Sequence, residues 1–248
     1  MSKLNHAWVK AALEQADNER SKISEREREL HGLSSTRLKC LINNLCAAEK
    51  TNYLEIGVYK GSTIISAVMG NDVKAVGVDN FMYDEREPRK WAPEGDIWYN
   101  VKSQMEANIQ RYNLHPETKI PGSITLVEKS FEEVDWVKQP KFNVCLFDVS
   151  PLNQKVYDDF FEKVIVSLTQ ECVVVFTGQS NAQHADELNK SLLRHQDKLD
   201  IQYSELRISG GLADATRYYS GARILGIKKK SGSFIKKPAP PKANTTSK

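Results

Sequence analysis

Long hydrophobic runs are missing from this sequence. No window contains the roughly 20 consecutive apolar residues that a transmembrane helix needs. The opening stretch, MSKLNHAWVKAALEQADNERSK, is polar and lacks the apolar centre of a signal peptide. Together these absences predict a soluble, cytoplasmic protein with no membrane partner.

Cysteine is scarce, and its spacing carries no motif. The four cysteines, Cys40, Cys46, Cys145 and Cys172, form no Cys-x-x-Cys pair and have no histidine-rich neighbourhood. Two of them, Cys145 and Cys172, lie inside apolar runs. This pattern is typical of free buried thiols in a reducing compartment and argues against disulfides or a zinc site.

Acidic residues are absent from the C-terminal segment 228–248, which contains seven lysines. Subtracting these lysines from the formal net charge of +3 leaves −4 for the rest of the chain. A nucleic-acid groove needs basic residues on a folded surface, so nucleic acid is not the expected partner. The segment 231–248 is also proline-rich and polar, which predicts a disordered basic tail.

From residue 52 onward, short apolar runs alternate with longer amphipathic segments. The apolar runs predicted as strands are NYLEIGV, VKAVGVDNF, SITLVEKS, FNVCLFDVS and ECVVVFTG. The segments predicted as helices between them are GSTIISAVMG, NVKSQMEANIQRYNL, NQKVYDDFFEKVIVSL and AQHADELNKSLLRHQD. This alternation indicates an α/β fold with a doubly wound, mostly parallel sheet.

The two ends of the chain follow other patterns. Two further strand-like runs, 199–209 and 222–230, have only a glycine-rich segment between them, which predicts a C-terminal antiparallel hairpin and a seven-stranded sheet. Apolar spacing predicts a helix near residues 6–16, and charge spacing predicts a solvated helix over 18–33. We therefore divide the chain into a helical N-terminal extension at 1–32, an α/β domain at 33–230 and the tail at 231–248.

The stretch YLEIGVYKGSTIISAV joins the first strand to the next helix through two glycines. Gly57 and Gly61 lie four residues apart, and Glu55 precedes them. Glycines let a backbone turn tightly and approach a ligand, but they also occur in a plain strand-to-helix turn. An acid here repels a pyrophosphate and favours a positively charged ligand, such as an ammonium or a sulfonium. Asp79 ends the second strand about 20 residues later, where a carboxylate can accept hydrogen bonds from ribose hydroxyls.

With Glu55-x-Gly57-x-x-x-Gly61, Asp79 and the closing hairpin, the chain resembles the class I S-adenosylmethionine-dependent methyltransferases over roughly residues 52–227. Within that superfamily, YLEIGVYKGSTI is similar to the small-molecule O-methyltransferases of the macrocin and cephalosporin-biosynthesis type. The resemblance implies a Rossmann-like methyltransferase fold and S-adenosyl-L-methionine as cofactor. It implies that the cofactor-binding residues are Glu55, Gly57, Val58, Tyr59, Lys60, Gly61 and Ser62 at the methionine part, Asp79 at the ribose, and Ser130 and Phe131 beside the adenine.

The fourth strand ends at Asp148, at the sheet edge where such folds bind ligands. The relatives carry Asp-Gly-x-His there with a tyrosine shortly after, and a metal-binding pair of acids after the fifth strand. This chain keeps the aspartate but has Val149, Ser150, Pro151 and Asn153, and Thr177 and Gly178 follow its fifth strand. Because a divalent cation needs several oxygen ligands, usually including carboxylates, we expect no bound metal.

Methyl transfer to a hydroxyl needs the acceptor held close and a base for its proton. Asp148 is the first candidate base, and His184, a few residues past the fifth strand, is the second. Asp148 can instead bind the cofactor or cap the next helix, and His184 can be a surface histidine in a helix's first turn.

The leading hypothesis is an S-adenosylmethionine-dependent methyltransferase that O-methylates a small or medium-sized acceptor. One alternative is a methyltransferase-like binding or accessory protein without turnover, because the histidine and the acid pair are missing. A nicotinamide-dependent oxidoreductase is disfavoured by Glu55 and the wide glycine spacing. The N-terminal helices could also form a homo-oligomer contact. Aromatic and basic side chains in two long loops are candidate acceptor contacts or loop packing: Tyr83, Trp91, Trp98, Arg217, Tyr218 and Tyr219.

Overall fold

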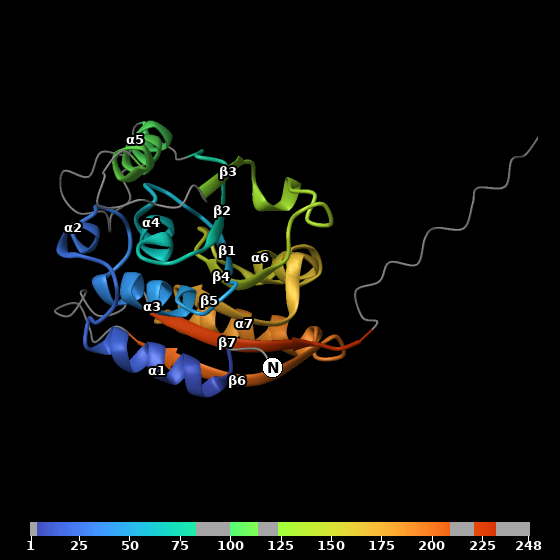
Figure 1. Ribbon diagram of the computed structural model, residues 1–248. Helices are drawn as coiled ribbons and strands as arrows, with labels where there is room; N and C mark the ends of the chain where they lie inside the picture. The colour runs from blue at the N-terminus through green and yellow to red at the C-terminus, as the bar shows by residue number, and fades with distance from the viewer. Residues whose placement is uncertain (1–3, 83–99, 114–123, 209–220, 232–248) are drawn as a thin grey trace, which may run out of the picture.

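The computed structural model describes residues 4–82, 100–113, 124–208 and 221–231. It contains a seven-stranded sheet with helices on both faces (Figure 1). The strands are β1 (Asn52–Ile56), β2 (Lys74–Asp79), β3 (Ile124–Glu128), β4 (Phe142–Phe147), β5 (Leu168–Thr177), β6 (Leu199–Arg207) and β7 (Ala222–Lys229). The helices are α1 (His6–Asp17), α2 (Glu25–Arg28), α3 (Thr36–Cys46), α4 (Ser62–Val68), α5 (Val101–Asn113), α6 (Gln154–Lys163) and α7 (Ala182–Arg194), with short 3₁₀ turns η1 (Phe131–Glu133) and η2 (Val164–Ser167).

The strand order is β3-β2-β1-β4-β5-β7-β6. The first five strands are mutually parallel, whereas β7 pairs antiparallel with β5 and β6 pairs antiparallel with β7. The predicted doubly wound sheet with an antiparallel end is therefore confirmed. The chain reverses its strand order between β1 and β4, so the carboxyl ends of these strands form the crevice where such sheets bind ligands.

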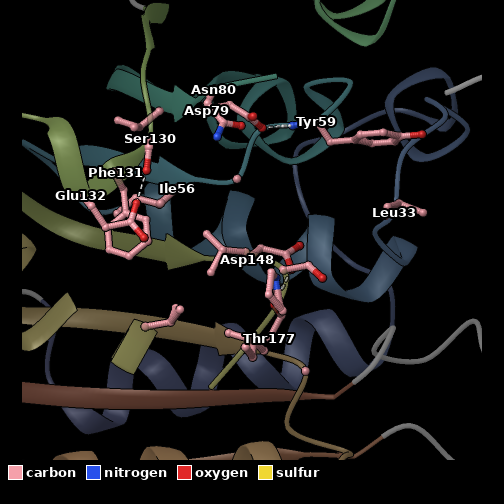
Figure 2. Close-up of a pocket in the computed structure, with 18 of the residues that line it drawn as sticks. Leu33, Ile56, Tyr59, Asp79, Asn80, Ser130, Phe131, Glu132, Asp148 and Thr177 are labelled. Carbon is pink, nitrogen blue, oxygen red and sulfur yellow. Dashed lines mark hydrogen bonds between the residues drawn. The ribbon is translucent and has the colours of Figure 1, made fainter. Parts of the chain in front are cut away.

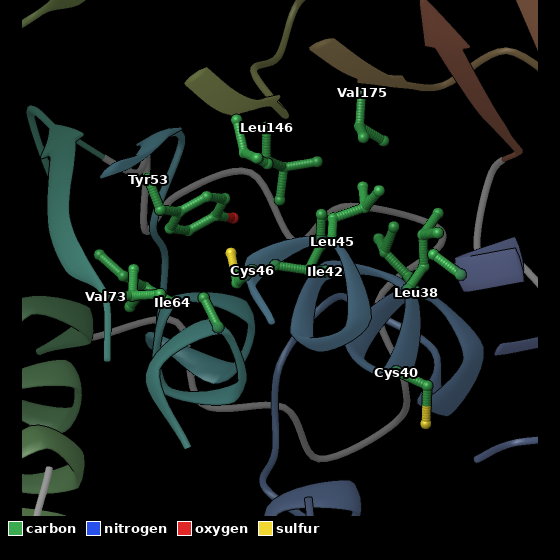
Figure 3. Packing of buried hydrophobic residues seen from close by; sticks show 14 of the residues in the cluster. Leu38, Cys40, Ile42, Leu45, Cys46, Tyr53, Ile64, Val73, Leu146 and Val175 are labelled. Carbon is green, nitrogen blue, oxygen red and sulfur yellow. The ribbon is translucent and has the colours of Figure 1, made fainter. Parts of the chain in front are cut away.

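Alternate residues of the central strands point into two separate cores. Tyr53, Leu146 and Val175 face a layer that contains α1, α3, α4 and α5, and Figure 3 shows Tyr53 beside Cys46 of α3. The opposite face, including Phe147 and Phe176, packs against α6 and α7. Burial on both faces explains why these strands are almost entirely apolar in sequence.

The N-terminal segment packs into the first of these cores. Val9 and Leu13 of α1 are fully buried in the same cluster as the sheet residues. At the far end of the sheet, the Tyr203 hydroxyl of β6 donates to the Leu4 carbonyl, and Arg207 pairs with Asp17. Helix α1 thus covers the β6–β7 end of the sheet, while the division of the chain at residue 32 stays a prediction.

The solvated helix predicted over residues 18–33 is wrong, because only the single turn α2 forms there. The Glu27 carboxylate accepts hydrogen bonds from the backbone N–H and the hydroxyl of Ser24, which starts the turn. The buried Lys39 ammonium donates to the carbonyls of Arg28 and Leu30 and so ends it. The local cap of Ser24 and Glu27 and the contacts of Lys39 together outweigh the charge pairing that favours a longer helix.

Among the helices that the structure describes, none has both the length and the apolar character needed to cross a membrane.

Candidate functional site

A cavity of about 800 Å³ opens at the carboxyl ends of the parallel strands. Its walls come from the residues that follow β1, β2, β3, β4 and β5, together with the first turn of α7. Figure 2 shows Asp79 and Asp148 across the cavity from each other, with Ser130, Phe131 and Glu132 at one side and Leu33 at the other. This size lies within the range of about 300–1,000 Å³ that small-molecule sites occupy.

The glycine turn after β1 forms part of the cavity wall. Gly57 has a φ of +90°, and a Cβ atom placed on it would lie 1.8 Å from the carbonyl oxygen of Asp148. The Asp148 N–H donates to the carbonyl of Ile56 at 2.8 Å, which holds the end of β4 against this turn. Only glycine satisfies both the left-handed backbone and the close approach. Gly61, with a φ of +81°, then forms the N-cap of α4.

Asp79 organises the same turn from the neighbouring strand. One oxygen of its carboxylate, Oδ2, accepts hydrogen bonds from the backbone N–H groups of Val58 at 2.8 Å and Tyr59 at 2.9 Å. The other oxygen accepts from the N–H of Phe81 at 2.7 Å. The carboxylate therefore fixes two turns at once, and it also contributes to the cavity wall.

Glu55, predicted to favour a cationic ligand, is not among the residues that line the cavity. Its side chain is fully buried in the α3–α4 core, where it accepts hydrogen bonds from the Tyr53 hydroxyl and the Thr63 hydroxyl, both at 2.6 Å. Burial raises the pKa of the Glu55 carboxyl to about 8, and the two hydrogen bonds act against this shift. Glu55 thus connects β1 to the first turn of α4 on the core side of the glycine turn, away from the cavity.

We expect this carboxyl to make stability pH-dependent. Its pKa is raised in the folded protein, so its contribution is fully present below the unfolded value of 4.5 and is lost as pH rises through about 8. In Glu55→Gln, whose amide keeps a hydrogen bond to each hydroxyl, the part of this loss due to Glu55, on the order of 4 kcal/mol, should vanish. Urea unfolding of both proteins between about pH 5 and pH 8.5 measures the difference. If the free energy of unfolding changed equally with pH in both proteins, the assignment to Glu55 would be contradicted.

The residues after β3 form one end of the cavity. The Ser130 hydroxyl donates to the Glu132 carboxylate, while the Phe131 ring is buried against Phe147 in an edge-to-face contact at 5.4 Å between centroids. The carbonyl of Phe131 also accepts from the indole N–H of Trp136 at 2.8 Å. These contacts fix the positions of Ser130, Phe131 and Glu132, which all line the cavity.

Asp148 and His184 both line the cavity, on the β4 and β5 side. Burial raises the pKa of the Asp148 carboxyl to about 6, and the hydrogen bond that it accepts from the Thr177 hydroxyl opposes the rise. His184 is half-buried in the first turn of α7, and its Nδ1 lies 3.3 Å from the carbonyl oxygen of Gly178. The two side chains predicted as candidate bases are therefore both placed at the cavity.

The structure brings together seven of the predicted site residues at the cavity wall: Gly57, Tyr59, Asp79, Ser130, Phe131, Asp148 and His184. Five others do not line it: Glu55, Val58, Lys60, Gly61 and Ser62. Of these, Lys60 is buried beside the Tyr59 ring, and the Ser62 hydroxyl bonds to that of Ser34. The loop candidates Tyr83, Trp91, Trp98, Arg217, Tyr218 and Tyr219 lie outside the described residues.

Sequence reasoning missed several residues of the wall. Asn80 and Lys129 lie near the carboxyl ends of the runs predicted as strands and directly follow β2 and β3 in the structure, so the rule that ligands bind at the carboxyl ends of parallel strands could have found them. Glu132 lies next to the predicted Phe131. Leu33, from the segment before α3, carries no local signal in the sequence, because only the tertiary fold brings it to the cavity.

The ionisable groups on the cavity wall are mostly acidic. Asp79, Glu132 and Asp148 contribute carboxyls, and Lys129 and His184 are the basic groups among the described lining residues. Within the described part of the chain, no three His, Cys, Asp or Glu side chains come together as a metal cluster would require. The charge balance of the wall favours a ligand with positive charge.

No family model matches this sequence, and no curated protein matches it either. Solved structures do share its fold. TrmN from Thermus thermophilus superposes with a TM-score of 0.52 at 13% identity, over 83% of this chain and 52% of that one. A candidate O-methyltransferase from Nostoc punctiforme gives 0.51 at 12% identity, over 77% and 56%. The chain thus spans about half the length of these two proteins.

A third neighbour matches over most of both chains. The methyltransferase PaMTH1 from Podospora anserina, solved with S-adenosylhomocysteine bound, gives a TM-score of 0.51 at 13% identity, over 92% of this chain and 89% of that one. At such low identities the likeness establishes the fold, which is the Rossmann-like fold of methyltransferases, with β7 between β5 and β6. The predicted fold class is thereby confirmed.

Proposed function

We propose that this protein is an S-adenosylmethionine-dependent methyltransferase that O-methylates a small or medium-sized acceptor. The observation that supports this most strongly is the cavity itself. In a methyltransferase fold, it joins a glycine turn, the turn-organising Asp79 and a mostly acidic wall at the carboxyl ends of the strands. One solved neighbour of similar fold carries S-adenosylhomocysteine.

The residues of the wall fit such a cofactor. Carboxyls from Asp79, Glu132 and Asp148 complement a ligand that carries both an ammonium and a sulfonium. Apolar atoms of Ile56, Val78 and Phe131 offer surfaces for a nucleoside. A dinucleotide, with its negatively charged pyrophosphate, would be repelled by the same carboxyls.

Each part of the site has a proposed task. We assign the turn from Gly57 to Ser62 to the methionine part of the cofactor. Gly57 and Tyr59 line the cavity and would contact that part. The other residues of the turn would maintain its shape: Val58, Lys60, Gly61 and Ser62. Asp79 is proposed to bind the ribose. Ser130 and Phe131 are proposed to contact the adenine. Glu55 is proposed to support the glycine turn without touching the cofactor, through its hydrogen bond with Thr63 in the first turn of α4.

When bound, the cofactor supplies an electrophilic methyl group. The chain must then hold the acceptor hydroxyl in line with that methyl and remove its proton. Among the described wall residues, the Asp148 carboxyl, whose pKa burial raises to about 6, and the His184 imidazole are the candidate bases. An acceptor hydroxyl bound between these two side chains and the glycine turn would exclude water from the reacting atoms.

Calorimetric titration with S-adenosylhomocysteine tests the proposal. We expect a dissociation constant between about 1 µM and 1 mM, the range in which enzymes hold their substrates, and no measurable heat with NADH. Binding of NADH without binding of S-adenosylhomocysteine would contradict the proposal. A protein that binds S-adenosylhomocysteine but methylates none of a panel of hydroxyl compounds would instead be the accessory protein considered above.

A further inference from the structure

Strand β6 forms the border of the sheet. Figure 1 shows it beside α1 at the end of the strand order, and within the described part of the chain β7 is its one partner strand. An edge strand presents backbone N–H and C=O groups that can pair with a further strand, and proteins usually protect such edges with lysine, proline or a short strand. The nine residues of β6, LDIQYSELR, include neither lysine nor proline. This edge is therefore suited to pairing with another strand.

The side chains of β6 divide between the two faces of the sheet. The register with β7 shifts between Ile201 and Tyr203, so Gln202 is the extra residue of a β-bulge. Successive residues of β7 point to opposite faces, and their partners in β6 follow them. The partners of even-numbered residues of β7 share the face covered by α1: Asp200, Tyr203, Glu205 and Arg207. The partners of odd-numbered residues share the opposite face: Ile201, Ser204 and Leu206.

This opposite face of β6 carries exposed apolar side chains next to α7. Arg223, the partner of Leu206 in β7, donates a hydrogen bond to the side-chain oxygen of Asn189 in α7. Leu193 lies one helical turn after Asn189 and is 63% exposed. Ile201 and Leu206 are 37% and 45% exposed. Exposed apolar side chains that are grouped, rather than scattered, indicate an interaction surface.

The sequence of β6 matches a second, antiparallel copy of itself. We place Ser204 of both copies on a two-fold axis and leave the bulged residue out of the count. Ile201 then lies opposite Leu206 of the second copy, and Asp200 lies opposite Arg207. Each pair joins residues of one face, as cross-strand partners must, and the axis repeats each pair. Apolar pairs and pairs of opposite charge both stabilise neighbouring strands.

The two nearest registers that keep the same faces together are disfavoured by charge. With Glu205 on the axis, the two Glu205 carboxylates would lie opposite each other. With Tyr203 on the axis, Asp200 would lie opposite Glu205 of the second copy. Because like charges directly opposite destabilise a strand pair, the register centred on Ser204 is favoured.

Arg207 keeps a donor group for this contact. Its Nε lies 3.3 Å from Asp17 and its Nη1 3.7 Å from Glu205, and Nη1 also donates to the Leu206 carbonyl. Its Nη2 makes no hydrogen bond to the described residues, and a guanidinium has five N–H donors in all. Asp200 of a second copy can therefore bind Arg207 without breaking its pair with Asp17.

We propose that this protein forms a two-fold symmetric dimer, in which the β6 strands of two copies pair antiparallel around Ser204 and join the two sheets into one. Among the described residues that line the cavity, none belongs to β6. The dimer is thus independent of the cofactor, and its failure would leave the function proposed above untouched.

Sedimentation velocity on the full chain tests the dimer. At about 100 µM, where specific complexes of modest affinity are populated, the wild-type protein should sediment at twice the monomer mass of 28.1 kDa. Leu206→Arg, which places a charge opposite Ile201, should sediment as a monomer. Val137→Arg, which changes another exposed apolar residue, past η1, should match wild type. A Leu206→Arg dimer would overturn the proposal, and so would a wild-type monomer, which would leave the edge to a protein of different sequence.

Cross-linking tests the register. The four native cysteines are buried, so a short bismaleimide should react with a cysteine introduced at the surface. In Ser204→Cys the two thiols would face each other across the axis, with about 5 Å between their Cβ atoms, and a cross-linked dimer should form. In Asp197→Cys, an exposed position before β6, the two thiols would lie on the order of 40 Å apart and should not be cross-linked. Cross-linking of both variants, or of neither, would contradict the pairing around Ser204.

Discussion

Replacing Gly57 with alanine should lower the affinity for S-adenosylhomocysteine by at least about 100-fold, because a displacement of about 1 Å in a binding turn is enough for an effect of that size. The added Cβ would lie 1.8 Å from the carbonyl oxygen of Asp148 and 2.7 Å from its carbonyl carbon. Because both atoms belong to the backbone, the turn itself must move. The positive φ adds strain of about 1–3 kcal/mol. Calorimetry measures the affinity, and urea unfolding shows how much of the loss accompanies destabilisation.

Gly70→Ala is the matched control. Gly70 also has a positive φ, +67°, but a Cβ there would lie 3.1 Å from the nearest atom, Cβ of Lys22, and away from the cavity. We expect a stability loss of about 1–2 kcal/mol from the left-handed backbone and unchanged affinity. If both variants bind S-adenosylhomocysteine equally well, the contact between the glycine turn and β4 does not position the cofactor.

Asp79→Asn should lower the free energy of unfolding by about 3 kcal/mol, because hydrogen bonds to charged groups are worth about 1.5–3 kcal/mol each. Both carboxylate oxygens accept backbone N–H groups, from Val58 and Tyr59 on one side and from Phe81 on the other. An asparagine has only one acceptor oxygen, so its NH₂ group must face N–H donors on one of the two sides. The loosened turn should also weaken S-adenosylhomocysteine binding by at least about tenfold, in line with the sensitivity of bound geometry to such shifts.

Urea unfolding and calorimetry on the same samples check both parts of this prediction. Asp72→Asn, which changes an exposed acid between α4 and β2, should stay within about 0.5 kcal/mol of wild type. Wild-type stability in Asp79→Asn would show that the turn does not depend on this carboxylate.

The parts of the fold set by local pattern were predictable from the sequence. Strands β1, β2, β4 and β5 are largely apolar because both of their faces are buried, and the helices between the strands carry a 3.6-residue period. The insertion of β7 between β5 and β6 follows burial too: β7 is largely buried, whereas β6 alternates and forms the edge. Only tertiary contacts, such as those of Lys39 with α2, shorten the predicted helix before α3.

The candidate site was predictable where a residue ends a strand, as Asp79 does, or directly follows one, as Gly57 and Asp148 do. Glu55 lies inside β1, and residues two apart in a strand share a face. Its side chain therefore follows Tyr53 into the α3–α4 core rather than reaching the cavity. Leu33 could not be found from the sequence, because the packing of the N-terminal helices alone brings it to the wall.

The central claim is that the cavity at the carboxyl ends of the strands binds the S-adenosylmethionine group, and backbone amide NMR during titration with S-adenosylhomocysteine tests it most directly. The account predicts large shifts for Gly57 to Tyr59, Asp79 to Phe81, and Ser130 to Glu132, with β6 and α1 unperturbed. Saturable shifts centred elsewhere, or no shifts at millimolar ligand, would contradict it.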